Sequence, residues 1–278
     1  MKPLLISFSG GRTSAAMAKY LKDKYEGKRG MLFVFANTGK ERPETLDFIN
    51  ECDKRWSLGV VWIEADIHTQ KGTGTTYKIV DYETADRKGI VFEYMIKKYG
   101  IPNKAQPHCT RDLKIVPIHK LAKDILGKDY ETAIGIRIDE AHRINWQKAK
   151  DKQYIYPLAT ELKATSQSIR KFWDSQEFDL QLKDYEGNCD MCWKKSERKL
   201  LTMILETPSL INWWVDMETK YGGEENYTFF RNNKSGLDLI ELSKQPFRKA
   251  VDAWDLSQQA PKMFTDLDIE FDCFCKSS

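Results

Sequence analysis

Residues 7–14, SFSGGRTS, place two glycines and four hydroxyl side chains directly after the first apolar run of the chain. Glycines let backbone amides approach an anion, and hydroxyl groups add further hydrogen-bond donors. A helix that begins near Thr13 would add the positive end of its dipole. These features indicate a phosphate-binding turn, although a strand-to-helix turn without a ligand uses the same residue types. The predicted binding residues are Ser7, Ser9, Gly10, Gly11, Arg12, Thr13 and Ser14.

Two arginines supply a second candidate group for anion binding. Arg137 and Arg143 flank Glu140 just beyond a predicted strand. A guanidinium group binds phosphate or sulfate oxygens with two parallel hydrogen bonds and stays charged. The alternative interpretation is an Arg–Glu network on the protein surface.

The residues after the second predicted strand are candidates for recognising the rest of a nucleotide. The backbone of Asn37, Thr38 and Gly39 could read adenine. Glu41 and Glu44 could hold Mg²⁺, although carboxylates at the start of a helix more commonly complement its dipole.

The six cysteines include one Cys-x-x-Cys pair, formed by Cys189 and Cys192. Two thiolates on one tight loop can bind a metal or form a redox disulfide. A structural zinc ion or a [4Fe–4S] cluster commonly takes four thiolates, so two further ligands are needed. We expect Cys109 as the third ligand and Cys275 as the fourth, with Cys273 as its alternative. A zinc site and free thiols are the competing interpretations of a cluster.

The elements that position these residues follow from the apolar pattern. Runs rich in β-branched and aromatic residues predict strands buried on both faces, at residues 4–8, 31–36, 60–64 and 132–136. Helical spacing predicts helices over residues 14–24, 43–54 and 114–126. Alternating strands and helices predict an α/β fold with a parallel sheet wrapped by helices. Cys52 lies within a helical apolar pattern, and we expect it in the core.

The same pattern of strands and helices predicts that the chain divides into two regions. Residues 1–160 are expected to form the α/β domain that binds the nucleotide, with an irregular insertion at 65–105 that contains one helix around 90–99. Residues 161–278 are expected to be mainly helical and to carry cluster cysteines, because they contain several Leu- and Trp-rich helical segments.

Composition restricts the class of protein. The 278 residues carry a net charge of +3, and no apolar stretch approaches the ~18 residues of a membrane span. The N-terminal apolar run is too short for a secretion signal, so we expect a cytoplasmic protein without a membrane partner. Basic runs at 143–152 and 194–199 could contact a nucleic-acid strand with Trp146 or Trp193 as stacking residues. A solvated charged face is the alternative.

Segments spread over most of the chain resemble the PP-loop superfamily, which includes the ATP pyrophosphatases and the phosphoadenosine phosphosulfate (PAPS) reductase family. The resembling segments are SGGRTS (9–14), FANTGKERPETLDFI (35–49), CTRDLKIVPI (109–118), GIRIDEAHR (135–143), IYPLAT (155–160) and GNCDMCWKK (187–195). The resemblance implies an adenine nucleotide alpha-hydrolase-like fold. It further implies that Gly135, Arg137 and Arg143 lie beside the nucleotide and that Ser9, Lys114 and Arg137 act in catalysis.

The chain departs from the patterns of this family at three places. Thr13 stands where many members have Asp, and Thr110 stands where cluster-bearing reductases have a second cysteine. The tail, DCFCKSS, lacks the Glu-Cys-Gly-x-His of the reductases, although Cys273 could still be a nucleophile.

Three functions are compatible with these observations. The first is ATP-dependent adenylation and thiolation of an acceptor, which could be a nucleic acid, with sulfur from a donor protein. The second is reduction of PAPS or adenylyl sulfate by Cys273, and the third is non-catalytic binding of a nucleotide or nucleic acid. We expect an adenine nucleotide, ATP or PAPS, in each enzymatic case, with a [4Fe–4S] cluster and a candidate role for Mg²⁺. A homodimer is a further expectation.

Overall fold

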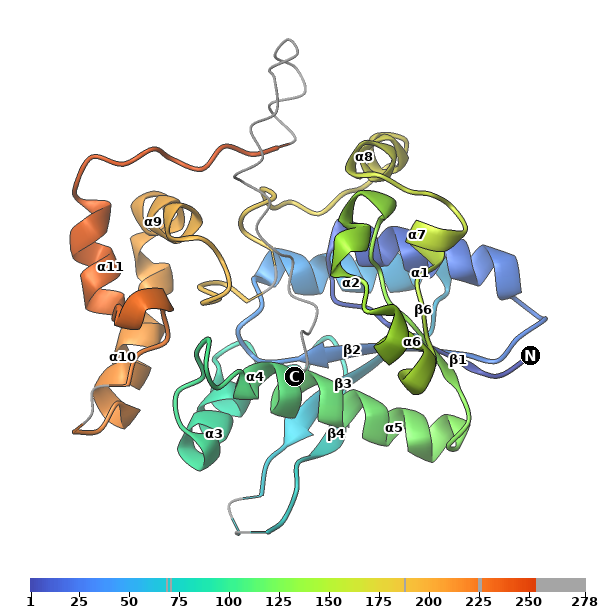
Figure 1. The fold of residues 1–278 in the computed structure, drawn as a ribbon, viewed down its shortest axis with the longest axis horizontal. Coiled ribbons are helices and arrows are strands. Elements are labelled where there is room, and N and C mark those ends of the chain that lie inside the picture. The colour runs from blue at the N-terminus through green and yellow to red at the C-terminus, as the bar shows by residue number, and fades with distance from the viewer. Residues whose placement is uncertain (69, 71, 188, 225–226, 254–278) are drawn as a thin grey trace.

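The sheet is assembled from short apolar strands that lie between two layers of helices (Figure 1). The structure is a computed structural model, and it describes residues 1–253 except 69, 71, 188, 225 and 226. The six strands lie in the order β4-β3-β2-β1-β5-β6. Their bounds are β1 Leu4–Ser7, β2 Met31–Asn37, β3 Val61–Asp66, β4 Thr76–Val80, β5 Glu131–Ala133 and β6 Tyr154–Ile155.

Five strands are parallel, as the alternating pattern predicts. In the centre of the sheet, Leu4 of β1 lies opposite Met31 of β2 and Glu131 of β5. The sixth strand, β4, pairs antiparallel with β3, so the sheet is mixed. β4 lies inside the segment 65–105 that was predicted to be irregular, and that prediction is wrong for these five residues.

Strand residues alternate between two separate cores, which confirms the prediction that the strands are buried on both faces. Leu4 and Ile6 of β1 pack in one core together with α1 (Arg12–Tyr25), α2 (Pro43–Trp56) and α8 (Ser166–Asp174). Leu5 points to the opposite core, which is covered by α5 (Val116–Leu126). This alternation is the two-residue period of a strand.

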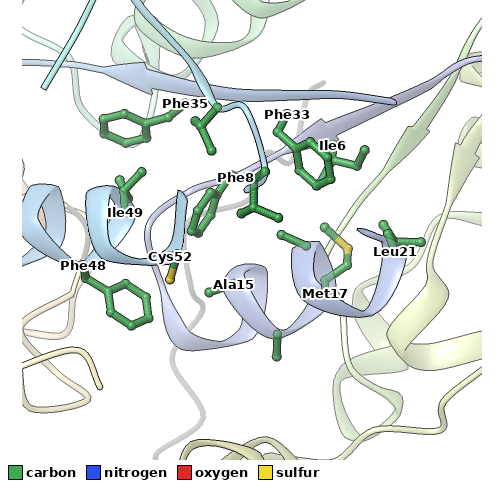
Figure 2. Packing of buried hydrophobic residues seen from close by; sticks show 14 of the residues in the cluster. Ile6, Phe8, Ala15, Met17, Leu21, Phe33, Phe35, Phe48, Ile49 and Cys52 are labelled. Carbon is green, nitrogen blue, oxygen red and sulfur yellow. The ribbon is translucent and has the colours of Figure 1, made fainter. Parts of the chain in front are cut away.

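The first core is dense in aromatic side chains (Figure 2). Phe8 and Phe35 contact residues of α1 and α2, and Cys52 of α2 lies among them without solvent exposure. Burial raises the pKa of the Cys52 thiol because the thiolate would lose its hydration. The prediction that Cys52 is a core residue is confirmed.

The segment before α5 shows an irregular helical path. The predicted helix at 90–99 is confirmed as α3 (Ile90–Tyr99), and α4 (His108–Thr110) leads into a π-helical turn, η1 (Arg111–Ile115), before α5. π-helical turns are rare and are frequent at functional sites. This turn contains Lys114, one of the predicted catalytic residues.

The C-terminal helices form a third core that also includes α3. Phe92 and Met95 of α3 pack with Trp214, Phe229 and other residues of the C-terminal helices. Conversely, Ile169 and Trp173 of α8 pack on the sheet domain. Each of the two predicted regions thus contributes a helix to the core of the other. The boundary at residue 160 stays a prediction. The remaining helices are η2 Ile138–Arg143, α6 Trp146–Lys152, α7 Pro157–Thr160, α9 Glu197–Glu206, η3 Pro208–Ile211, α10 Asn212–Tyr221, η4 Arg231–Asn233 and α11 Gly236–Ser243.

Within the part of the chain that the structure describes, no helix has the length and apolar character needed to cross a bilayer.

Candidate functional site

The order of the parallel strands changes direction between β1 and β5, which is where open α/β sheets bind ligands. The turns that leave these two strands lie against each other. A side chain at Gly135, after β5, would stand 3.6 Å from the Cα of Ser14, and Arg137 Nη1 donates to Thr13 Oγ1 over 3.3 Å. The structure therefore brings Gly135 and Arg137 to the turn after β1, and their position beside a nucleotide stays a prediction.

The two glycines of this turn have different environments. Gly10 has a φ of +80°, and a Cβ there would stand 2.6 Å from Cγ2 of Thr45, so the turn packs tightly on α2. Gly11 is the N-cap of α1, and a Cβ there would meet no atom within 4 Å. The amides of Gly10 and Gly11 have no hydrogen-bond acceptor among the described residues. Amides that face open space at a helix start can bind an anion.

The hydroxyl groups of the turn are tied to one another. Ser9 Oγ donates to Ser14 Oγ over 3.1 Å, and Ser14 Oγ donates to the carbonyl of Gly11 over 2.9 Å. Ser7 is half-buried at the end of β1. These contacts hold the turn in shape, and its role in phosphate binding stays a prediction.

The side chain of Arg12 points to a different partner from the one predicted. Its guanidinium binds Asp179 through two bonds of 2.7 and 2.8 Å and donates to the carbonyl of Leu182 over 3.0 Å. Trp173 Nε1 donates to the Arg12 carbonyl over 3.0 Å. Arg12 therefore fastens the segment after α8 to the start of α1.

Glu140 lies between the two predicted arginines. Arg137 Nη1 lies 3.4 Å from Glu140 Oε2, and Arg143 Nη1 pairs with the other carboxylate oxygen. Arg137 also pairs with Asp139 over 3.0 Å. The Arg–Glu network left open by the sequence is present, and it holds Arg137 at the rim of the turn after β1.

Asn37, predicted to read adenine, is fully buried at the end of β2. Its Nδ2 donates to Glu64 Oε1 over 2.7 Å and to the carbonyl of Asp86 over 2.8 Å, while its Oδ1 accepts from the amide of Gly39. The side chain of Asn37 is therefore occupied in shaping the turn. Glu64 was missed as a partner, and its signal was an acidic residue in the otherwise apolar strand VVWIE.

Thr38 continues this turn and binds Glu41. Both the amide and the hydroxyl of Thr38 donate to Glu41 Oε2 over 2.8 Å, and Lys114 Nζ lies 3.4 Å from Oε1. Lys114, predicted as catalytic, thus lies at the carboxyl end of β2. Because both oxygens of Glu41 already have donors, a magnesium ion would have to displace one of them.

The Cys-x-x-Cys loop docks on the same turn. Cys189 forms an isolated antiparallel bridge with Glu41, and its Sγ lies 3.5 Å from Thr38 Oγ1. Asp190 pairs with Lys40 over 2.9 Å. The predicted cysteine loop and the predicted nucleotide segment are therefore neighbours, although 148 residues separate Glu41 from Cys189.

Cys109 lies close to this loop. It is half-buried at the start of the helical path into α5, and Thr110 beside it accepts from Lys194 Nζ over 3.1 Å. Cys109, Cys189 and Cys192 are the three predicted metal ligands that the structure describes. In the described ranges, no three or more His, Cys, Asp or Glu side chains converge closely enough to hold a metal ion. These residues alone do not fit a cluster, and Cys273 and Cys275 lie outside the described residues. The cluster and the zinc site stay predictions.

The two tryptophans considered for stacking differ in exposure. Trp193 is 6% exposed and packs in the third core, so it is not accessible for stacking on a nucleic-acid base. Trp146 is 60% exposed at the start of α6.

The comparisons with known proteins agree with this geometry. The model of the phosphoadenosine phosphosulfate reductase domain matches residues 3–153, more than half of the chain. The chain belongs to this family. The matched residues of the PAPS reductase domain thus include β1, its glycine turn and the strands β2 to β5, and they end just before β6.

Two relatives of this PAPS reductase family member align with most of its chain. The "Uncharacterized nin region protein ORF290" of Escherichia phage lambda is 36% identical over 200 residues, which cover 70% of this chain and 67% of that protein. The "Uncharacterized protein MJ0066" of Methanocaldococcus jannaschii is 23% identical over 233 residues, which cover 81% of this chain and 43% of that protein. Membership in the family supports a nucleotide-related function in sulfur chemistry.

Proposed function

We propose that this protein binds ATP with its phosphates on the turn Ser9–Ser14 and uses it to activate an acceptor for the addition of sulfur. The observation that carries the proposal is the turn after β1. There, the amides of Gly10 and Gly11 have no acceptor among the described residues, and Arg137 stands 3.3 Å from Thr13. Unpaired amides and a guanidinium group suit phosphate oxygens.

The proposed reaction has two balanced steps. An acceptor oxygen attacks the α-phosphorus of ATP and displaces pyrophosphate, which leaves an adenylated acceptor. A sulfide-level sulfur from a donor then replaces that oxygen, forms the carbon–sulfur bond and releases AMP. Amides oriented before the reaction stabilise the charge that develops on pyrophosphate, because they need no reorganisation. The acceptor could be a nucleic acid, and the sulfur donor a second protein.

The proposed roles of the individual residues follow from their positions. Ser9 and Arg137 would contact the phosphates, and Arg143 would hold Glu140 so that Arg137 stays at the turn. Lys114 would act from the end of β2, where it lies 3.4 Å from Glu41. We further propose that Cys275, which lies outside the described residues, would complete a [4Fe–4S] cluster or zinc site with Cys109, Cys189 and Cys192, which do not form a metal site by themselves.

A second function is favoured by the family match itself. A thiol of the chain, for which we propose Cys273, would attack the sulfur of PAPS or adenylyl sulfate and release the nucleotide. A second thiol from a dithiol reductant would then form a disulfide with it and release sulfite. The same turn after β1 would bind the nucleotide in this reaction.

Product analysis of the anaerobically purified full chain tests these proposals. Incubation with ATP, sulfide and bulk tRNA or DNA is expected to yield AMP and pyrophosphate together, and Arg137→Gln is expected to abolish both. Sulfite from PAPS with a dithiol, without pyrophosphate from ATP, would replace the first function by the second. Tight binding of ATP with neither product would favour a non-catalytic binding protein.

A further inference from the structure

A pocket of about 270 Å³ opens between the start of α2 and the C-terminal helices. It lies beside the predicted nucleotide turn, because the first turn of α2 contributes Pro43 and Glu44 to the pocket while Thr45, the next residue, packs on Gly10. Its lining residues are Gly39, Lys40, Glu41, Arg42, Pro43, Glu44, Arg87, Asp190, Thr207 and Leu210.

Arg42 is an incompletely paired cation in the wall of this pocket. Its side chain is 13% exposed, and its Nη1 has no hydrogen-bond partner among the described residues. Its closest carboxylates are Glu44 at 3.4 Å and Glu186 at 3.9 Å. Charge-assisted bonds normally measure about 2.7–2.9 Å, so both contacts are loose. A buried donor without an acceptor costs stability, and a rotation of the guanidinium toward an acceptor oxygen of a ligand would recover that cost.

Arg87 adds a second cation at the rim of the pocket. Its guanidinium donates to the carbonyls of Ala85 and Tyr82 over 3.0 and 2.6 Å. In the described part of the chain, no carboxylate lies within ion-pair distance of Arg87, so its charge is not neutralised.

Two of the three carboxylates in the pocket wall have lysine partners: Asp190 pairs with Lys40 over 2.9 Å, and Glu41 lies 3.4 Å from Lys114. Within the described residues, the third, Glu44, makes only the long contact with Arg42 described above. Asp190 also accepts from Trp214 Nε1 over 2.8 Å. The cations that a ligand can still engage are therefore Arg42, whose contacts with Glu44 and Glu186 are long, and Arg87.

We propose that this pocket binds an oxyanion, a phosphate or carboxylate group, and that the oxyanion belongs to the acceptor molecule. The identity of the acceptor rests on the proposed function, whereas binding of the oxyanion does not. Two guanidinium groups on one pocket suit a group with several acceptor oxygens. The position also fits, because the first turn of α2 separates this pocket from the turn Ser9–Ser14, and an acceptor must lie next to the nucleotide that activates it.

Equilibrium dialysis of the full chain against inorganic phosphate, and separately against acetate at equal ionic strength, tests the proposal. We expect two phosphate sites: Arg87→Gln removes one with at least about a tenfold loss of affinity, and Arg137→Gln removes the other. Acetate bound at the Arg87-dependent site would identify a carboxylate, and phosphate alone a phosphoryl group. Arg55→Met, at the other end of α2, is the control for loss of one positive charge and should retain both sites.

A second variant separates binding from folding. Arg42→Met removes the unpaired donor, so we expect loss of the Arg87-dependent site with an unchanged or raised melting temperature. If Arg87→Gln and Arg42→Met retain every phosphate site that the wild type has, the pocket proposal is overturned and the nucleotide site stands. If Arg137→Gln changes nothing while Arg87→Gln removes phosphate, the nucleotide proposal fails and the pocket stands.

Discussion

Gly10 and Gly11 are neighbours in the turn after β1, yet the structure predicts opposite consequences for replacing each of them by alanine. Gly10→Ala should unfold the protein more easily, because the new Cβ meets Thr45 and Ile49. Gly11→Ala should leave stability unchanged and impair nucleotide binding, because its Cβ enters open space beside the free amides.

The magnitudes follow from the local geometry. At Gly10 the φ of +80° costs alanine about 1–2 kcal/mol. Contacts of 2.6 and 2.9 Å to Thr45 and Ile49 add about 1–3 kcal/mol of overpacking. The free energy of unfolding should therefore fall by roughly 2–5 kcal/mol.

At Gly11 two small terms oppose each other. Alanine is a poorer N-cap than glycine, which lowers stability by roughly 0.5–1 kcal/mol. Alanine also restricts the unfolded chain more than glycine does, which raises stability by about 0.4–1 kcal/mol. The backbone at φ −95° and ψ 159° accepts alanine without strain. A methyl group that keeps a phosphate from the amides should weaken ATP binding by at least about tenfold, or ~1.4 kcal/mol.

Urea unfolding and calorimetric titration with a non-hydrolysable ATP analogue measure the two effects separately. Gly30→Ala is the matched control, because a Cβ at Gly30 also meets no atom within 4 Å and lies before β2, away from the turn. ATP binding by Gly11→Ala at the affinity of the wild type and of Gly30→Ala would refute the reasoning.

Three further predictions concern the surroundings of the site. Glu64→Ala should lower the free energy of unfolding, measured by urea titration, by roughly 2–4 kcal/mol. The reason is that the Asn37 side chain and the Asp86 amide lose Glu64 as their acceptor. A loss below about 1 kcal/mol would contradict this prediction. Anaerobically purified protein should contain iron and sulfide that Cys189→Ala loses and Cys52→Ala retains, and zinc without iron in the wild type would exclude the cluster. Burial lowers the pKa of His119 below 6.5, so the folded state resists its protonation. Stability should consequently fall as pH decreases below about 6.5, and a pH series of melting temperatures should show a smaller fall for His119→Asn.

The sequence predicted those elements whose residues interact over short distances along the chain. Pro43 suited the first turn of a helix, and α2 begins there. The apolar run at 31–36 was predicted as a strand and forms β2, because a continuous apolar run is typical of a strand buried on both faces. β4 was missed because its residues are half-buried or exposed, and only its pairing with β3 makes it a strand.

Contacts between distant segments account for what the sequence missed at the site. The pairing of Arg12 with Asp179 spans 167 residues, and neither residue has a local signal for it. The pairing of the Asn37 side chain with Glu64 on the neighbouring strand was not predicted either, while recognition of adenine by the backbone at Asn37 stays a prediction. Burial of Trp193 likewise depends on the packing of the C-terminal helices. Residue types predicted the chemistry of the site, and the fold determined which atoms face it.

A crystal structure of the protein with a non-hydrolysable ATP analogue tests the central claim most directly. The account predicts phosphate oxygens within about 2.7–3.2 Å of the amides of Gly10 and Gly11, with the Arg137 guanidinium on the same phosphates. A turn that stays empty at saturating analogue, or a nucleotide bound elsewhere on the protein, would contradict it.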